Sequence, residues 1–436
     1  MQFRSTHAQD PQVSFKDVVL RCLPPDEGLY VPAQMPDMRQ FFMYMDAKTT
    51  YPELVATMAP ALIQGELNPL SAKRVVESAF SFEPELIPLD DNISLLSLYN
   101  GPTGVFKDFG IAFLAAVMEE LLKNSGSSMV LSASRGNMGV SLAQAFRGRK
   151  GVNSVILYPT GPIRGLDPAS FVTNGGNVIP IQVTGTFDDC QRLIVEAIED
   201  RPFAERYGIT SANAINLGRL LPQCFYYIYA FVKIKNSLRG DLVFSVPCGN
   251  FGNLIAGLYA WKFGMPVKGY IAAMNVNDAF GDYIRGKRFV PRPVVPTNSP
   301  SLDVGIPSNY KRLAAFYEES PAVMRNMVYP ASIGDDRTLS TIGKVWKRYG
   351  VLLDPHSAVA FAAAEDLGAS QEFAGHVHTV VLATGHPAKR SVLVSQAIGQ
   401  NIEIPPRLAQ LQRQVDPIAI IRPRLEALEG VIASCL

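Results

Sequence analysis

The stretch DLVFSVPCGNFGNLIAGLYAWKFG, residues 241–264, decides the fold class of this chain. Residues 242–247 are mostly apolar and β-favouring, which is typical of a strand that is buried on both faces of a sheet. A glycine-rich turn, residues 248–253, separates this run from an apolar segment of helix length. Glycines permit a tight turn, and the backbone N–H groups at the start of the following helix attract anions. The turn is therefore a candidate phosphate site, although its spacing is neither the dinucleotide fingerprint nor the P-loop, and an ordinary strand-to-helix turn is the alternative.

The same pattern of strand, turn and helix recurs along the chain. Short apolar runs lie at residues 128–134, 154–159, 267–274 and 378–384, with helix-length amphipathic segments between them. Nearly continuous apolar strands that alternate with helices predict an α/β fold with a parallel sheet covered on both faces. Because ligands of such sheets bind at the carboxyl ends of the strands, we expect the chemistry in the loops that follow these runs.

The composition excludes several classes of function. The chain has 436 residues, enough for two or three domains, and its 40 lysines and arginines nearly balance its 39 aspartates and glutamates. It therefore has no net field that would recruit nucleic acid or an anionic membrane. Its five cysteines show no CxxC spacing, and its polar start and lack of long apolar runs argue against a signal peptide or a membrane span. We expect a cytoplasmic protein with neither nucleic-acid nor membrane partners.

Two further loops follow apolar runs. In SRGNMG, residues 134–139, the Asn137 amide can bind a ligand oxygen, whereas a capped helix start is the alternative. In TGHPAK, residues 384–389, the Thr384 hydroxyl can face a ring nitrogen. No carboxylate falls at a spacing that would complete a metal site with the nearby histidines, so no metal is predicted.

One lysine stands out in GPTGVFKDFG, residues 101–110. Phe106, Phe109 and Phe113 give Lys107 an apolar setting, which disfavours the ammonium and favours the neutral amine. A neutral amine can form a Schiff base, whereas a solvated lysine at a helix start is the alternative. A phosphate cradle, a neutralisable lysine, an amide and a hydroxyl together match one cofactor, pyridoxal 5'-phosphate.

Motifs along nearly the whole chain resemble those of the threonine synthases, pyridoxal-phosphate enzymes of the tryptophan-synthase-β fold group. They are EGLYVP (27–32), GPTGVFKDFG (101–110), VTGTFDDCQ (183–191), TSANAINLGRLLPQ (210–223), VPCGNFGN (246–253), LDPHSAVAFAA (353–363) and HPAKR (386–390). The resemblance implies an α/β fold type II enzyme with large and small parallel-sheet domains and an N-terminal domain. The expected divisions are an N-terminal domain at 1–97, a large domain at 98–125 and 170–400, a small domain at 126–169 and a C-terminal helical tail at 401–436.

The resemblance also implies roles for residues of this chain. The predicted cofactor-binding residues are Lys107, Asn137, Gly249, Asn250, Phe251, Gly252, Asn253 and Thr384. The predicted substrate-binding residues are Asp108, Ser134, Arg135, Asn216 and Arg219. The family is a carbon–oxygen lyase of amino-acid biosynthesis that converts O-phosphohomoserine and water to threonine and phosphate by γ-elimination and β-addition. Lys107 would move the protons of this reaction as acid and base.

The chain departs from the usual family pattern where the substrate is expected. Asn100 replaces a histidine, the SRGNMG loop replaces TSGDTG, and Gly385 replaces an alanine. These changes leave open a pyridoxal-phosphate lyase or replacement enzyme for another activated amino acid, while the intact Lys107 argues against a non-catalytic paralogue. Arg135 can bind the phosphate or carboxylate of a small amino-acid substrate. The expected binding partner is thus a small, phosphorylated amino-acid substrate. The chain is expected to be a monomer or a homodimer.

Overall fold

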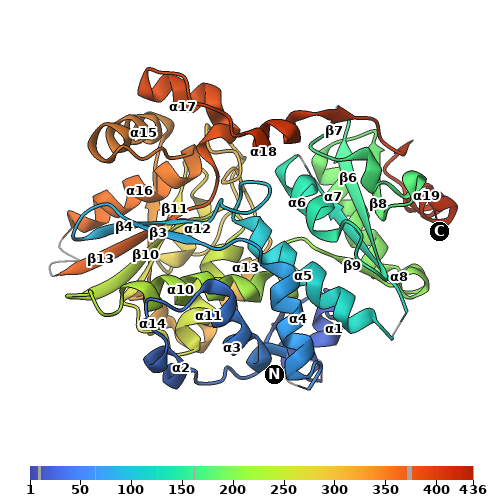
Figure 1. Cartoon of the computed structure of the whole chain (residues 1–436), viewed down its shortest axis with the longest axis horizontal. Coiled ribbons are helices and arrows are strands. Elements are labelled where there is room, and N and C mark those ends of the chain that lie inside the picture. Colours follow the sequence, from blue (N-terminus) through green and yellow to red (C-terminus); the bar gives the residue numbers. More distant parts are fainter. Residues whose placement is uncertain are drawn as a thin grey trace.

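The computed structural model describes residues 1–7, 11–63, 65–124, 126–134, 136–161, 163–370 and 376–435, without the side chains of Asn137 and Ile163. Two separate sheets, each with its own helices, make up the body of the molecule, and Figure 1 shows them side by side. This arrangement confirms the predicted α/β class with a large and a small parallel sheet.

The larger sheet has six strands in the order β12-β11-β10-β13-β4-β3. Its strands are β3 (Glu85–Pro88), β4 (Ile93–Ser97), β10 (Asp241–Pro247), β11 (Gly269–Met274), β12 (Val328–Ser332) and β13 (Val377–Ala383). All neighbours are parallel except β3, which pairs antiparallel with β4 at one edge. The central strands β10 and β11 are buried along almost their whole length, as their continuous apolar runs predict.

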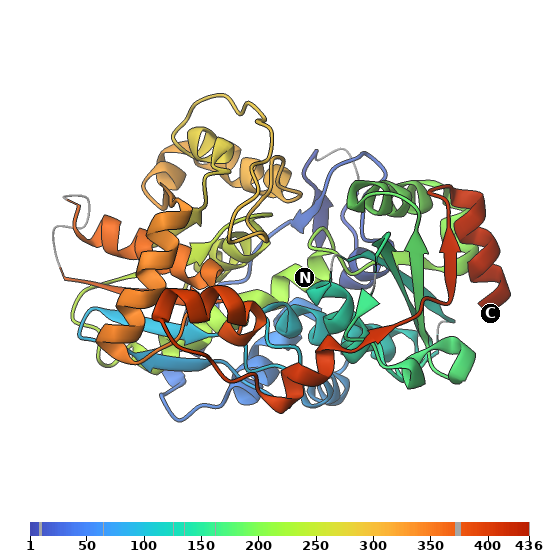
Figure 2. The same ribbon diagram turned by 90° about the horizontal axis from the view of Figure 1, so that it is seen from above.

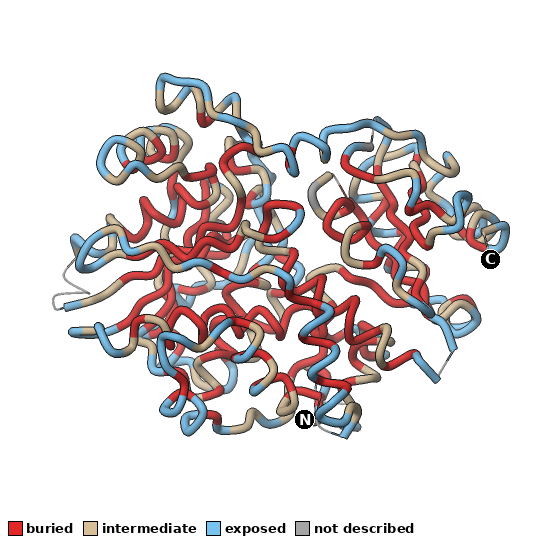
Figure 3. The backbone as a smooth tube through the Cα atoms, viewed as in Figure 1, coloured by how far each residue is buried: buried red, intermediate tan, exposed pale blue. Residues whose placement is uncertain are grey.

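Helices cover both faces of this sheet. They are α3 (Tyr51–Ile63), α4 (Pro69–Ala79), α5 (Lys107–Leu122), α10 (Cys224–Ile234), α11 (Gly252–Lys262), α12 (Ala279–Ile284), α13 (Tyr310–Glu319), α14 (Pro321–Arg325), α15 (Asp335–Tyr349), α16 (Pro355–Gly368) and α17 (Ser391–Ile398). One apolar core joins one sheet face to α3, α4, α5, α10 and α11, and a second joins the other face to α15, α16 and α17. In Figure 3 the buried backbone is concentrated in these layers.

The smaller sheet has five parallel strands in the order β15-β8-β6-β5-β9. They are β5 (Ser128–Ala133), β6 (Val152–Pro159), β8 (Val178–Val183), β9 (Ile209–Ser211) and β15 (Ala419–Ile421). The helices of this unit are α6 (Asn137–Phe146), α7 (Phe187–Glu199), α8 (Arg201–Tyr207) and α19 (Leu425–Cys435). One face of this sheet packs with α7, α8 and α19 in an apolar core of its own, whereas the face toward α6 shares the large apolar core of the other unit.

The remaining elements are short. They are β1 (Phe3–Ser5) with β2 (Tyr30–Pro32), β7 (Ile163–Arg164) with β14 (Gln414–Val415), and the helices α1 (Phe15–Arg21), α2 (Arg39–Tyr44), α9 (Leu217–Leu220) and α18 (Pro406–Ala409). Figure 2 shows the last part of the chain running from the larger unit across to the smaller one, where it adds β15 and α19.

The expected domain divisions do not match the sheets. Strands β8 and β9, placed in the large domain by the boundary at residue 169, pair within the smaller sheet, and β4, placed in the N-terminal domain, pairs with β13. The expected C-terminal helical tail also contains a strand, β15, that pairs with β8. The reason is that hydrogen-bond partners fix sheet membership, and adjacency in sequence does not reveal which strand lies at an edge.

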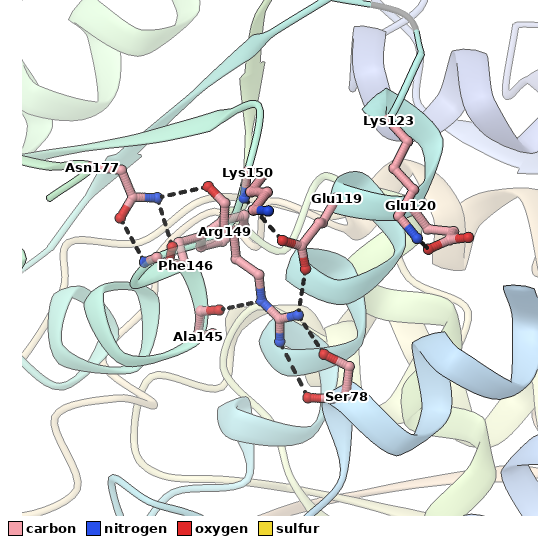
Figure 4. A network of polar contacts seen from close by, with 10 residues as sticks. Ser78, Glu119, Glu120, Lys123, Ala145, Phe146, Arg149, Lys150 and Asn177 are labelled. Atoms are coloured by element: carbon pink, nitrogen blue, oxygen red, sulfur yellow. Dashed lines mark hydrogen bonds and ion pairs between the residues drawn. The ribbon is translucent and has the colours of Figure 1, made fainter.

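A polar cluster joins the smaller unit to the helices of the larger one. The Arg149 guanidinium donates to Glu119 Oε2 (2.8 Å), Ser78 Oγ (2.5 Å) and Ala145 O (3.1 Å), and Glu119 Oε1 accepts from Lys150 N (2.9 Å). As Figure 4 shows, this one side chain contacts α4, α5 and the end of α6. Because α5 begins at Lys107, the cluster holds the lysine helix against the smaller unit.

Replacing Arg149 with alanine is expected to lower the free energy of unfolding by about 2–3 kcal/mol, because the mostly buried Glu119 carboxylate loses its charged partner. Arg147 is the matched control. Its ion pair with Asp167 is more than 40% exposed on both sides, so Arg147→Ala should cost no more than about 1 kcal/mol. Urea unfolding of both variants measures the difference, and equal losses would contradict the prediction.

Candidate active site

The segment that carries Lys107 is joined to the loop after β13. Phe106 N donates to Thr384 O, and His386 N donates to Gly104 O; both hydrogen bonds are 2.9 Å long. Val105 and Gly385 form an antiparallel bridge between these two contacts. Lys107 is the first residue of α5 and directly follows Phe106, which is bonded to Thr384. Thr384 itself lies at the carboxyl end of β13, a central strand.

Lys107 itself lies in an unusual electrostatic setting. It is half-buried, and burial together with the positive charges of Arg219 and Lys389 lowers the pKa of Lys107 to about 8, although Asp108 opposes the shift. Its Nζ lies 6.0 Å from the centroid of the Phe106 ring. The neutral amine is thus far more populated near neutral pH than in an ordinary lysine. The sequence predicted the apolar setting and named Arg219 as a site residue, but it did not predict Lys389 as a site residue.

The glycine-rich turn after β10 lies one strand away from Thr384, because β10 and β13 are neighbours. A side chain at Gly249 would place its Cβ 2.5 Å from Ser301 O, so this position admits only glycine without a shift of the backbone. Phe251 has a left-handed φ of 56°, and α11 begins at Gly252. The turn therefore ends on a helix N-terminus, as the sequence predicts for an anion site.

The two asparagines of this turn differ in their contacts. Asn250 Oδ1 accepts from Ser308 N (2.9 Å), which ties the turn to the loop before α13. Asn253 Oδ1 accepts from the hydroxyls of Tyr226 (2.5 Å) and Tyr227 (2.8 Å). The buried Nδ2 of Asn253 has no hydrogen-bond partner within the described part of the chain. A buried amide donor without a partner costs free energy, so it indicates a ligand acceptor at this position.

The second predicted loop is only partly described. Ser134 is buried, and its hydroxyl accepts from Gly136 N (3.0 Å) and Gly139 N (2.7 Å) while it donates to Gly136 O (3.1 Å). Its hydrogen-bonding capacity is spent on its own turn, which argues against the predicted substrate contact. Asn137 begins α6, but its side chain and the whole of Arg135 lie outside the described residues.

Two other predicted substrate residues also point into the protein. Asn216 is fully buried, donates to Val19 O (3.0 Å) and Ser211 O (2.8 Å), and accepts from Gly218 N (2.9 Å) as the cap of α9. Its contacts are those of a cap and do not support substrate binding.

Asp108 accepts from the backbone N (2.8 Å) and hydroxyl (2.6 Å) of Thr103. Burial raises the pKa of Asp108, although these hydrogen bonds oppose the shift. The Thr103 hydroxyl also lies 2.7 Å from Ser141 Oγ on α6. Asp108 therefore fixes the turn before Lys107 and its contact with the smaller unit, and this geometry does not support a contact with substrate.

Arg219 remains a strong candidate for binding an anion. It is 3% exposed, its Nη1 donates to Ala212 O (2.8 Å), and its Nε has no hydrogen-bond partner among the residues that are described. Burial lowers the pKa of Arg219 to about 10, which leaves it charged at neutral pH. A buried cation is costly unless it is paired, so the position favours a negatively charged ligand beside Lys107.

Two further cations near this segment were not predicted as site residues. Lys389 Nζ donates to Thr103 O (2.8 Å), and burial lowers the pKa of Lys389 to about 8, with Asp108 opposing and Arg407 adding to the shift. Arg407, on α18, donates to Gly101 O and to Tyr99 O (3.2 Å). The HPAKR motif signalled Lys389, whereas no motif signalled Arg407. The site is thus positively charged on several sides.

A cavity of about 1060 Å³ lies elsewhere, at the amino ends of β4 and β13. Its lining includes Asp91, Ser94 and His378 and none of the predicted site residues. In the described ranges no group of histidine, cysteine, aspartate or glutamate side chains gathers in a way that could hold a metal ion.

Comparison with known proteins covers the chain from end to end. Residues 89–385 match the family model described as a pyridoxal-phosphate-dependent enzyme, residues 2–80 match the threonine synthase N terminus, and residues 357–432 match the threonine synthase C-terminal region. The threonine synthase of Buchnera aphidicola from Schizaphis graminum is 34% identical over 94% of both chains. That of Escherichia coli K12 is 33% identical, also over 94% of both. The chain belongs to the threonine synthase family.

Solved structures of the threonine synthase family have the same fold. The crystal structure of the Escherichia coli enzyme covers 100% of both chains with a TM-score of 0.86 and 31% identity. The pyridoxal-phosphate-bound enzyme of Brucella melitensis covers 100% of this chain and 99% of its own with a TM-score of 0.87 and 29% identity. The predicted fold type II, the cofactor and the class of carbon–oxygen lyase in amino-acid biosynthesis are confirmed.

The residues of this family member fit pyridoxal phosphate. The unpartnered Nδ2 of Asn253 and the helix start at Gly252 suit a phosphate, and the depressed pKa of Lys107 suits a covalent link to an aldehyde.

None of the helices in the described ranges combines the length and apolarity needed to traverse a bilayer.

Proposed function

We propose that this chain converts O-phosphohomoserine and water to threonine and phosphate. The observation that carries the proposal is the position of Lys107, an amine with a pKa of about 8 beside Arg219 and Lys389 and one residue from the backbone bond to Thr384. The proton-transfer group and the groups that favour a phosphorylated substrate thus lie together. The 34% identical relative from Buchnera aphidicola, named threonine synthase, supports the same reaction.

The residues that would hold the cofactor are those of the predicted set. Lys107 would bind its aldehyde carbon, the turn from Gly249 to Asn253 its phosphate, Asn137 its phenolic oxygen and Thr384 its ring nitrogen. When bound, pyridoxal phosphate withdraws electrons from the α-carbon of an amino acid. Glycines in the turn let backbone N–H groups approach the phosphate without steric conflict.

Lys107 would transfer the protons. An amine with a pKa of about 8 exchanges protons readily near neutral pH, so Nζ can take the α-proton and return protons at neighbouring carbons. Burial lowers that pKa most, Arg219 and Lys389 add to it by like-charge repulsion, and the same two charges attract an anion. Binding of the phosphorylated substrate would place an anion beside these positive charges, which favours it over unphosphorylated amino acids.

Several finer properties belong to this proposal. The substrate would be a phosphorylated amino acid held by Arg219 and Lys389, with Arg135 as a further candidate outside the described residues. The chain would act in the cytoplasm as a monomer or homodimer. All five cysteines are free thiols in the structure, which suits a reducing compartment.

A phosphate-release assay with O-phosphohomoserine tests the proposal, with the organic product identified by mass and with homoserine as the unphosphorylated control. One threonine per phosphate is expected. A keto acid would replace the proposal with a lyase activity. A protein that binds pyridoxal phosphate but releases no phosphate would assign it to another activated amino acid.

The loading of cofactor-free protein should report the pKa of Lys107. Because only the neutral amine attacks an aldehyde, the loading rate is expected to rise with pH up to about 8 and then to level off. For an ordinary lysine the loading rate would keep rising up to pH about 10. Stopped-flow absorbance after mixing with pyridoxal phosphate measures the profile, and a rise that continues to pH about 10 would contradict the expected environment of Lys107.

A further inference from the structure

One buried carboxylate, that of Asp354, is linked through two neighbouring residues to both sides of the proposed cofactor site. Asp354 precedes α16 and is 3% exposed. Its Oδ1 accepts from the backbone N (3.0 Å) and the hydroxyl of Ser357, and its Oδ2 accepts from His356 Nδ1 (2.5 Å). Burial raises the pKa of Asp354, but His356 and the hydrogen bonds from both neighbours outweigh it, so the net pKa is below the usual value. The carboxylate is charged and divides its two oxygens between two partners.

The first partner leads to Thr384 and to the lysine segment. Ser357 Oγ donates to Asp354 and accepts from Thr384 N (3.1 Å). Thr384 O in turn accepts from Phe106 N (2.9 Å), the residue before Lys107. Because every group in this series is buried or half-buried, the hydrogen bonds fix where the carboxyl end of β13 and the start of α5 lie.

The second partner leads to the glycine-rich turn. His356 Nδ1 donates to the charged Asp354, so the unprotonated Nε2 accepts from Ser301 N (3.2 Å). Ser301 O packs against Gly249 so closely that a Cβ added at Gly249 would lie 2.5 Å from it. Asp354 thus sets the tautomer of His356, and this tautomer holds the backbone that packs directly on the turn.

Gly385 leaves room for this arrangement. A Cβ at Gly385 would lie 2.9 Å from Asp354 Oδ2, the oxygen that accepts from His356. A methyl group here would push on the carboxylate.

We infer that Asp354 is a positioning residue that sets, through Ser357 and His356, the spacing between the ring end and the phosphate end of the cofactor site. The inference rests on the proposed function only for which loop holds which end of pyridoxal phosphate. Asp354 makes no contact with the cofactor in this scheme. It acts by fixing two backbone segments that come from distant parts of the sequence.

Asp354→Asn separates this role from helix capping, because asparagine caps helices as well as aspartate does. Its Oδ1 can still accept from Ser357, but its amide nitrogen then faces His356 Nδ1 as a donor. The ring proton must move to Nε2, where it opposes the N–H of Ser301. The variant therefore breaks the arm to the glycine turn and keeps the arm to Thr384.

Binding of pyridoxal phosphate is compared with binding of pyridoxal, which lacks the phosphate, by absorbance titration. In Asp354→Asn the affinity for pyridoxal phosphate divided by that for pyridoxal should fall about tenfold or more, because the turn that would bind the phosphate is displaced. In Ser357→Ala, which cuts only the arm to Thr384, both affinities should fall by a similar factor. Asp200→Asn, at the cap of α8 in the smaller unit, is the matched control and should change neither.

Hydrogen exchange gives a second readout that needs no ligand. In Asp354→Asn the amide of Ser301 should exchange about tenfold faster, whereas Ser357→Ala should leave it unchanged. A wild-type affinity ratio together with wild-type exchange at Ser301 would overturn the inference. If the unaltered protein bound no pyridoxal phosphate, the proposed function would fail while the exchange result would still decide the role of Asp354.

Discussion

Replacement of Lys107 by alanine is expected to lower turnover by about 1000-fold or more and to leave the cofactor without a covalent link. The side chain is an amine with a pKa of about 8 on the residue that follows Phe106, whose backbone N bonds Thr384 O, so its removal deletes both the attachment point and the proton carrier. Steady-state phosphate release measures the first loss, and mass spectrometry after borohydride reduction measures the second. Retained turnover would contradict the mechanism.

Lys123 provides the control for this experiment. It lies at the other end of the same helix, and its side chain is 49% exposed and pairs with Glu120. Lys123→Ala should leave turnover and reduction labelling unchanged. Lys107→Arg is a further test, because arginine keeps the positive charge but stays protonated, and it should be as inactive as the alanine variant. If Lys107→Arg were active, charge and not proton transfer would be the contribution of Lys107.

The sequence predicted the parts of the fold that depend on local pattern. The continuous apolar run at β10 gave a central strand, and the turn after it begins a helix at Gly252, as expected. The Thr384 loop follows β13, as the sequence placed it, and there Phe106 of the lysine segment bonds Thr384 although 278 residues separate them. Parallel strands point their carboxyl ends to one edge, and that rule predicted the place of the Thr384 loop but not its contact with the lysine segment.

What the sequence could not predict depends on partners far apart in the chain. Ser134 and Asn216 have the residue types of ligand contacts, yet Ser134 bonds its own turn and Asn216 bonds its own turn and Val19 O. Lys389 and Arg407 reach the segment before Lys107 from the last quarter of the chain. Asp354 joins two loops through side chains whose tautomer and bonds appear only in three dimensions. Residue type alone does not say which neighbour satisfies a polar group.

Gly249→Ala should weaken binding of pyridoxal phosphate by about 10- to 100-fold. The added Cβ would lie 2.5 Å from Ser301 O and 3.2 Å from Leu302 Cα, and both are backbone atoms that cannot turn aside. The glycine turn or the facing loop must therefore shift, and either shift moves the N–H groups that would bind the phosphate. Absorbance titration of the cofactor-free variant with pyridoxal phosphate gives the dissociation constant.

Gly368→Ala separates this steric effect from any general cost of removing a glycine. At Gly368, which ends α16, a new Cβ meets no atom within 4 Å, so cofactor affinity should stay at the wild-type value. Thermal unfolding of both cofactor-free variants shows whether the fold survives. If Gly249→Ala kept its fold and its affinity, the phosphate would have to bind away from this turn. A loss confined to phosphate-bearing ligands, with pyridoxal binding unchanged, would place the phosphate at the turn, because only that end of the cofactor would have been displaced.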